Sequence, residues 1–422
     1  MPIATLNEES IRQQGFYVPQ FKVKIQGVGL PSDVLRDVTQ LTYKDNIKEI
    51  DSFEATVNNW NPNTRDFKYV GSETAEELAH QTGDDRLLRI FEPCNKEVEV
   101  WMGYAGDLRL MLKGTFTTME PTFPASGAPT LAVRGLNVLH RLRPKQYSTN
   151  WGASSDKPQG WRDSEIAKNI ASLIDKDMNK PNNKRFPLPI VINTAAQDKE
   201  ERLPYVAQKN QYDIDFLLTR ALRLGYVVVV REGNPKSKNP DEREQHLYFG
   251  PSEGTIPGQR EVTFKLKWGI SLIDFKPTLT TANQVRSVTV NGWDRGKKKL
   301  ISSKVTLEDK ELNINRDLHE VIMNCEPREE IVVDKPVFSE KEAKAVALAI
   351  LKDRTKEMVK ASGTCVGLPD LRAGRKLVID GLGSRFNGTY FVTETTHTIN
   401  DSGYITKFNA RREQVGLLEG LQ

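Results

Sequence analysis

The hydrophobic period changes twice along the chain, and the order of the three resulting blocks constrains the fold more than any other feature. Within residues 21–134, short runs such as 21–26 alternate apolar and polar side chains, the period-2 pattern of half-buried strands. Within residues 166–222 the apolar side chains recur with the period of amphipathic helices. Within residues 264–410 the alternation returns. This order predicts an α+β, β-rich fold in which two β modules bracket a small α+β domain.

The first β module is expected at residues 15–146. Its short strands are separated by turn signals, which is typical of a sandwich or barrel. A polar insert at about residues 60–90 interrupts it, and residues 72–88 are expected to be helical. The composition shifts to Ser, Asn, Gly, Pro and Trp at residues 147–160, which indicates a domain boundary. The middle domain is therefore expected at residues 147–261.

Two amphipathic helices define the middle domain. Their apolar faces consist of Ile166, Ile170, Leu173 and Ile174 in the first helix, and of Ile214, Leu217, Leu218, Ala221 and Leu222 in the second. Either Asp163 or Ser164 can cap the first helix, and either Asn210 or Asp213 the second. Gly225 supplies a stop signal, and a run of four valines predicts that a strand follows directly.

The second β module is expected in two pieces, residues 262–305 and 366–412. Apolar and polar residues alternate in both pieces, so both are predicted to contain strands. Residues 306–365 between them are expected to form an inserted helical segment, because Ser339 and Glu342 have the spacing of a capping box. Residues 413–422 then form a C-terminal tail.

Charge and composition exclude several classes of protein. The 422 residues include 60 Lys and Arg against 56 Asp and Glu, a net charge of +4. A balance so close to neutral argues against a specific nucleic-acid partner, which would gather basic residues on one face. No run approaches the ~20 apolar residues of a membrane span. The N-terminal residues lack the apolar stretch of a secretory signal peptide.

The sequence shows no catalytic, cofactor-binding or metal-binding constellation. The GxSxG, GxxxxGK[ST] and HExxH motifs are absent, and none of the five histidines lies within four residues of another His or a Cys. The glycines of residues 381–384 favour a tight hairpin over a nucleotide site. Cys94, Cys325 and Cys365 are widely spaced and form no CxxC motif, which excludes a disulfide scaffold and indicates reduced thiols. No site residue of these three kinds is assigned.

Several runs in fixed order nevertheless resemble a known family. The runs are residues 268–277, 284–294, 367–374, 379–383 and 403–412, together with Tyr390, His397 and the middle-domain stretch 208–217. They resemble the phage late control D family of T4-type baseplate hubs, which includes the N-terminal hub part of valine-glycine-repeat spike proteins. The resemblance spans about residues 15–412. It departs from the family at Arg295, where proline commonly follows the Gly-Trp-Asp of residues 292–294.

The resemblance implies a structural role in a contractile injection machine, such as a phage tail, a pyocin or an extracellular injection system. Members of the family are homotrimers in which each subunit supplies two tube-like β-barrels, so that six barrels adapt a sixfold inner tube to a threefold spike. The implied partners are other copies of this chain, the inner tube protein, an OB-fold and β-helical spike protein, and other baseplate components. Assembly is expected in the bacterial cytoplasm. Only ten residues follow residue 412, so the spike is expected to be a separate chain; the alternative is that the sequence stops short of a fused spike.

Strands and hairpins of the barrels are the expected contact elements of such a hub. The residues assigned to this interface are Val285, Val288, Val290, Trp293, Tyr404, Thr406 and Phe408. Two other functions stay open on the sequence alone. A tail-associated cell-wall hydrolase would need catalytic residues, and a carbohydrate-binding module would need a row of exposed aromatic side chains.

Overall fold

The computed structural model describes most of the chain. The described residues are 3–5, 18–47, 49–63, 65–70, 90–93, 96–143, 145–175, 184–186, 188–231, 240–251, 263–294, 296–312, 314, 316–383 and 386–412. The helix expected at residues 72–88 and the tail at 413–422 lie outside them. The α+β, β-rich class expected from the sequence is confirmed.

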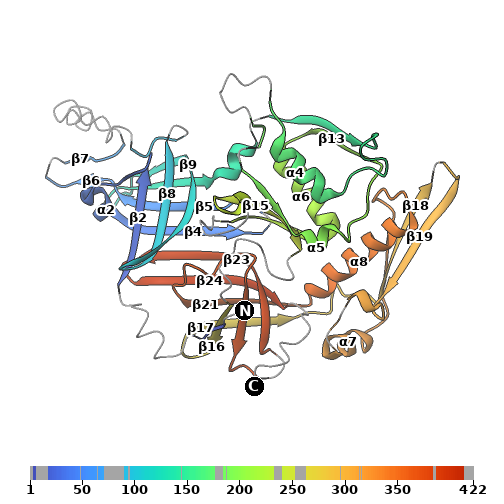
Figure 1. The fold of residues 1–422 in the computed structure, drawn as a ribbon. Coiled ribbons are helices and arrows are strands. Elements are labelled where there is room, and N and C mark those ends of the chain that lie inside the picture. The colour runs from blue at the N-terminus through green and yellow to red at the C-terminus, as the bar shows by residue number, and fades with distance from the viewer. Residues whose placement is uncertain are drawn as a thin grey trace.

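The two β modules are joined in a single 14-stranded sheet (Figure 1). Along its main path the strands are β1 (Ile3–Thr5), β16 (Thr263–Lys267), β22 (Lys376–Asp380), β23 (Gly388–Asn400), β4 (Val38–Asn46), β5 (Ser52–Asn58), β10 (Thr130–Asn137), β9 (Asp107–Thr122), β8 (Glu97–Tyr104), β2 (Pro19–Ile25) and β3 (Val28–Gly29). From β23 the sheet also continues through β24 (Gly403–Arg412) and β21 (Val359–Val366) to β17 (Leu272–Leu279). The short hairpin β6 (Trp60–Asn61) and β7 (Asp66–Phe67) lies outside this sheet.

Strand β23 is the element that joins the modules. Its first residues pair with β22, and its later residues pair with β4, where His397 lies opposite Tyr43. A bulge between Val392 and Glu394 interrupts its pairing with β24. A bulge bends a strand and increases its local twist, so β23 can pass from one curved module of the sheet into the other.

Each module curls around its own apolar core, as the alternation along its strands requires. The first core contains Leu41, Phe53, Val100, Phe116 and Val133, and the short helix α2 (Ser32–Asp37) contributes Val34. The second core contains Leu266, Leu272, Ile379, Tyr390 and Phe408. Ile399 and Tyr404 come from β23 and β24 but pack in the first core, so the two modules interlock.

The middle domain packs helices on small sheets. Its elements are the 3-10 helix η1 (Val138–Leu142), β11 (Tyr147–Gly152), α4 (Asp163–Ser172), β12 (Ile190–Ile192), α5 (Thr194–Gln197), β13 (Tyr205–Gln211), α6 (Asp213–Leu224), β14 (Tyr226–Arg231), η2 (Pro240–Glu242) and β15 (His246–Pro251). Gly225 ends α6 in the left-handed conformation, with φ of 68°, as expected for a helix stop. The N-cap positions are occupied by Arg162, just before the expected Asp163 and Ser164, and by Tyr212, between the expected Asn210 and Asp213.

The insert between the strands of the second module is a sheet with helices, and its limits differ from the expected ones. It contains β18 (Ser287–Asp294), β19 (Lys299–Thr306), η3 (Lys310–Leu312), α7 (Arg316–Met323), β20 (Glu329–Val332) and α8 (Glu340–Lys356). Strands β19, β18 and β20 form a separate three-stranded sheet, so the expected barrel residues 287–305 belong to the insert. Strand β21 belongs to the second module although the insert was expected to extend to residue 365. Sequence periodicity identified the strand at residues 285–290 that corresponds to β18, but it identified neither β19, β20 and β21 nor how these strands pair.

Candidate functional site

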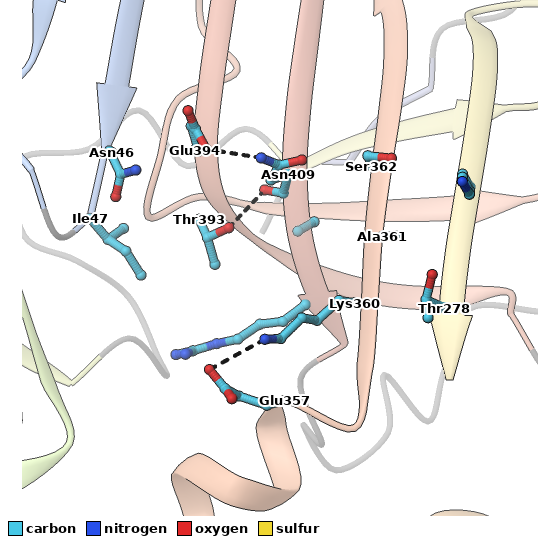
Figure 2. Close-up of a pocket in the computed structure, with 13 residues that line it drawn as sticks. Asn46, Ile47, Thr278, Glu357, Lys360, Ala361, Ser362, Thr393, Glu394 and Asn409 are labelled. Atoms are coloured by element: carbon cyan, nitrogen blue, oxygen red, sulfur yellow. Dashed lines mark hydrogen bonds and ion pairs between the residues drawn. The ribbon is translucent and has the colours of Figure 1, made fainter. Parts of the chain in front are cut away.

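The outer face of the second module carries a shallow polar groove (Figure 2). Its volume is ≈ 490 Å³, and it lies over β23, β24, β21 and β17. Its lining residues are Asn46, Ile47, Lys276, Thr278, Glu357, Lys360, Ala361, Ser362, Thr393, Glu394, Asn409, Ala410 and Arg411. An adjoining hollow of ≈ 480 Å³ shares Ser362, Glu394 and Asn409 with it, so the concave surface continues along the strands.

Polar side chains in the groove are bonded to one another. The Asn409 amide donates a hydrogen bond to the Glu394 carboxylate at 2.9 Å, and the Thr393 hydroxyl donates one to the Asn409 carbonyl at 3.1 Å. Lys360 and Glu357 form an ion pair at 3.5 Å near the end of α8 (Figure 2). These contacts leave a polar surface of mixed charge, and they do not place a nucleophile next to a base.

The polar character of this face continues onto the first module. On β4 the inward side chains are Leu41 and Tyr43, while Thr42 and Lys44 point to the other side. The Thr42 and Thr398 hydroxyls lie 3.5 Å apart across the β4–β23 pair. Both modules therefore present one continuous outer face, rich in threonine and other polar side chains.

A buried loop between β21 and β22, residues 367–374, ties the modules together from inside. The Arg372 guanidinium donates hydrogen bonds to the carbonyl of Leu110 at 2.8 Å, the carbonyl of Met111 at 3.0 Å and the hydroxyl of Tyr43 at 2.8 Å. It also lies over the Tyr43 ring, 4.8 Å from its centroid. Because these acceptors belong to β9 and β4, one side chain from the second module fixes two strands of the first.

A buried carboxylate also holds the loop. Asp45 on β4 accepts a hydrogen bond from the Ala373 backbone N–H at 3.0 Å and another from the Thr395 hydroxyl on β23. Burial raises the pKa of Asp45, and the positive charge of Arg372 opposes that shift. The carboxylate and the guanidinium therefore lie in the same junction on opposite modules.

His397 is fully buried beside these groups. Its Nε2 lies 3.0 Å from the Leu371 carbonyl, and its Nδ1 lies 3.0 Å from the Tyr404 hydroxyl. A carbonyl only accepts, so Nε2 carries the proton and Nδ1 accepts. Burial and then the charge of Arg372 lower the pKa of His397 well below its usual value, which keeps the ring neutral.

The middle domain contacts the same loop. Arg231 on β14 donates hydrogen bonds to the carbonyls of Ala373 at 3.2 Å and Gly374 at 3.4 Å. Val229 from the same strand packs in a small core with Ile47 and Phe391, one from each module. The loop is thus the point at which all three parts of the chain meet, and we call residues 367–374 with these contacts the three-way junction.

Six of the seven residues assigned to an interface from the sequence are buried in the chain's own cores. Val285, Val288 and Val290 are 9%, 0% and 0% exposed. Tyr404, Thr406 and Phe408 are 6%, 0% and 3% exposed. Strands β18 and β24 each pair on both sides, so neither is an edge strand. The expectation is corrected for these six side chains, because a side chain inside the core cannot meet a partner.

Trp293 is the exception, and the structure groups it with residues that sequence reasoning missed. It is 56% exposed and lies directly opposite Leu300, which is 62% exposed, on the β18–β19 hairpin. Ile331 and Val333, at the end of β20, are 64% and 72% exposed. Their alternation with buried Val332 was a detectable strand signal, but alternation does not tell which face meets solvent.

Neither a metal centre nor a membrane helix is found in the part of the chain that the structure describes. Among these residues, no group of three or more His, Cys, Asp or Glu side chains could hold a metal ion. None of the described helices is long and apolar enough to cross a membrane.

Solved structures similar to this chain come from phage tails and from a secretion system. A prophage MuSo2 43 kDa tail protein from Shewanella oneidensis has a TM-score of 0.61 at 12% identity, covering 94% of this chain and 99% of its own. A tail protein from Neisseria meningitidis has a TM-score of 0.58 at 12% identity, covering 94% and 98%. The E. coli protein c3393, described as a type VI secretion component similar in structure to the T4 tail proteins gp27 and gp5, has a TM-score of 0.50 at 11% identity, covering 94% and 78%.

These likenesses define the class: the chain has the fold of phage tail proteins, in agreement with the resemblance found in the sequence. The chain belongs to the family described as the Alg8 N-terminal domain, whose model matches residues 18–401. No curated protein matches the chain significantly.

Proposed function

We propose that this chain is the structural hub of the baseplate of a contractile injection machine. In this proposal three copies form a ring, and each contributes two β modules, so that six modules meet a sixfold inner tube and one threefold spike. The observation that carries the proposal is the continuous sheet, in which β23 fixes the two modules side by side with a common outer face. A subunit that supplies one third of a sixfold ring needs two such modules held in a constant relation.

The chemistry of the outer face suits a surface that stays in water. Protein interfaces concentrate apolar and aromatic side chains at their centre and exclude charges from it. The groove instead shows Lys276, Glu394 and Asn409, and hydroxyl groups continue across β4. We therefore propose that this face lines the central channel of the ring, and that the tube and the spike bind at its two ends.

The other partners follow from the same role. A hub contacts other baseplate components at its periphery, and its spike is proposed to be a separate chain. Assembly of the particle is proposed to take place in the bacterial cytoplasm. The role is proposed to be structural and not enzymatic; the groove carboxylates Glu394 and Glu357 contact Asn409 and Lys360, and none of the contacts described above sets a nucleophile beside a base.

The test is the mass of the purified chain in solution, measured by light scattering alone, with the inner tube protein, and with the spike protein of the same particle. A trimer that binds tube subunits, alone or once the spike is added, is the expected result. A chain that stays monomeric with both partners contradicts the proposal.

A second measurement tests the alternative function, a tail-associated cell-wall hydrolase. Loss of turbidity when the chain is added to a cell-wall suspension would indicate a hydrolase. A matched variant, Glu394→Gln, keeps the hydrogen-bonding shape of the side chain and removes its charge. If lysis occurred and Glu394→Gln abolished it, the groove would be an active site and the structural role would be wrong.

A further inference from the structure

The two faces of the insert sheet, which consists of β19, β18 and β20, differ in their surroundings. Its inner face packs under α8 and contributes Val288, Val290 and Ile301 to the second core. Its outer face carries the exposed side chains Trp293, Leu300, Ile331 and Val333, which we call the outer insert face. The stability of the insert comes from the inner face, so the apolar residues of the outer face are not explained by folding.

The apolar side chains of the outer insert face are neighbours. Trp293 and Leu300 form a direct cross-strand pair, and Ile331 lies opposite Thr289 on the other side of β18. Val333 follows one residue after the end of β20, in line with Ile331. Side chains on diagonal positions of a sheet lie within about 8 Å, so an aromatic ring at Trp293 reaches toward β20. A contiguous exposed apolar patch of this kind marks an interaction site more often than an isolated residue does.

The hairpin tip next to this patch is basic. Lys297, Lys298 and Lys299 are all exposed, and in the described part of the chain no ion pair involves them. Asp294 accepts the backbone N–H groups of Gly296 and Lys297 at 2.9 and 3.0 Å, which fixes the shape of the turn. Three lysines against this one carboxylate give the tip a net positive charge beside an apolar surface.

The hairpin projects from the body of the molecule. In Figure 1, β18 and β19 extend beyond α8 at the side opposite α2, away from the strands that carry the polar outer face. A partner bound there would not enter the proposed channel. The place is suited to a component that surrounds the ring.

We propose that the outer insert face binds a protein of the particle whose surface has an apolar patch bordered by carboxylates. Trp293 and Leu300 enter the apolar patch, and Lys297, Lys298 and Lys299 pair with the carboxylates. The charge of the partner is inferred from the net positive charge of the three exposed lysines, since complementary charge gives an interface its orientation and specificity. The inference rests on the proposed hub function for the place of the partner, but it concerns a surface distinct from the tube and spike contacts.

The experiment replaces the chain in the producing strain by the double variant Trp293→Ala/Leu300→Ala and measures its amount per sheath subunit in purified particles by quantitative mass spectrometry. The control variant, Tyr205→Ala/Leu222→Ala, removes two equally exposed side chains of the middle domain, which are 58% and 66% exposed. Incorporation of the double variant is expected to fall at least about tenfold, because a central aromatic anchor carries a large share of binding energy. The control is expected to be incorporated like the native chain.

A second variant tests the charges. Lys297→Glu/Lys298→Glu/Lys299→Glu reverses the tip without touching the apolar pair, and it is expected to lower incorporation as well. A photo-crosslinking amino acid at position 300 is expected to join the chain to an acidic peptide of another particle protein. Unchanged melting temperatures of the purified variants show that folding is not the cause.

The outcomes separate this inference from the hub function. Native chain missing from purified particles contradicts the hub function itself. If purified particles contain the native chain and contain the double variant in the same amount, the outer insert face is not a docking site. A crosslink to a second copy of this chain, or a smaller mass of the variant in light scattering, overturns the proposed partner, because the face would then join two copies.

Discussion

The three-way junction and the hairpin tip are two turns that carry basic residues, and they use them in opposite ways. Arg372 is 9% exposed, and its donors bond carbonyl and hydroxyl groups of the other module. Lys297, Lys298 and Lys299 are exposed, with no ion pair in the described part of the chain. Residues 367–374 form one of the runs by which the sequence resembles the hub family, and the hairpin tip directly follows another, residues 284–294. The difference teaches that one basic turn fixes the parts of this chain, whereas the other is available to something outside it.

The largest effect is expected from Arg372→Met. The change leaves the carbonyls of Leu110 and Met111 without their donor and removes the positive charge that faces Asp45. Removing one partner of a buried charged network costs about 3–5 kcal/mol. Chemical denaturation of the purified variant measures this loss of unfolding free energy.

The matched control for that variant is Arg134→Met on the same sheet. The Arg134 side chain is 46% exposed and pairs with Glu54 and Glu120 at the surface. Exposed ion pairs contribute about 0–1 kcal/mol. Equal losses for the two variants would show that the junction does not hold the modules together.

A smaller loss is expected from Gly367→Ala, which tests the packing of the same loop. A Cβ at this position would lie 2.1 Å from Cγ of the Tyr404 ring. Overpacking of this kind costs about 1–3 kcal/mol. Gly29→Ala is the control, because its Cβ would meet only Cε of Lys22, at 3.7 Å. The free energies of unfolding of the two variants are compared, and an unchanged value for Gly367→Ala would contradict close packing at the junction.

The junction is also expected to depend on pH through His397. Its pKa is lowered in the folded chain, so below about pH 6.5 the unfolded chain binds a proton that the folded chain does not. The stability from this group is present above that pH and falls by up to about 1.4 kcal/mol per pH unit as the pH decreases. The measurement is the difference in unfolding free energy between the native chain and His397→Gln from pH 5 to 8.

The difference between the native chain and the variant is needed because Asp51 changes the stability with pH in the direction opposite to His397. Burial and the nearby charge of Asp45 raise the pKa of Asp51 to about 7, so its contribution is lost as the pH rises toward that value. Subtracting the unfolding free energy of His397→Gln from that of the native chain largely removes the pH dependence that Asp51 contributes to both. A difference that stays constant between pH 5 and 6.5 would mean that His397 accepts a proton in the folded junction.

The sequence predicted local structure better than it predicted which strands pair and which faces become buried. The Gly225 stop and the Ser339 cap were predicted, because a left-handed residue and a hydroxyl near a free N–H are local requirements. Tyr404 and Phe408 were expected to share a face, and they do. Whether that face meets a core or a partner depends on β23 and β21, which pair with β24.

Long-range pairing explains the rest of what the sequence missed. The junction depends on the register of β4 against β23, whose paired residues are separated by about 350 positions, as for Asp45 and Thr395. No local period encodes such a register. The outer insert face was missed for a related reason, since Ile331 and Val333 have the composition of core residues and only their place on an edge of the insert sheet exposes them.

The smallest effect on stability is expected from Trp293→Ala/Leu300→Ala. Both side chains lie on the solvent side of the insert sheet, and exposed substitutions away from special features change stability by about 0.5 kcal/mol or less. Val290→Ala on the inner face of the same strand is the comparison, because it removes a fully buried side chain and is expected to cost more than 1 kcal/mol. Thermal unfolding of both variants measures the two losses. A loss for the outer pair as large as for Val290→Ala would assign Trp293 and Leu300 to folding, and the contrast between an internal junction and an external docking face would then be lost.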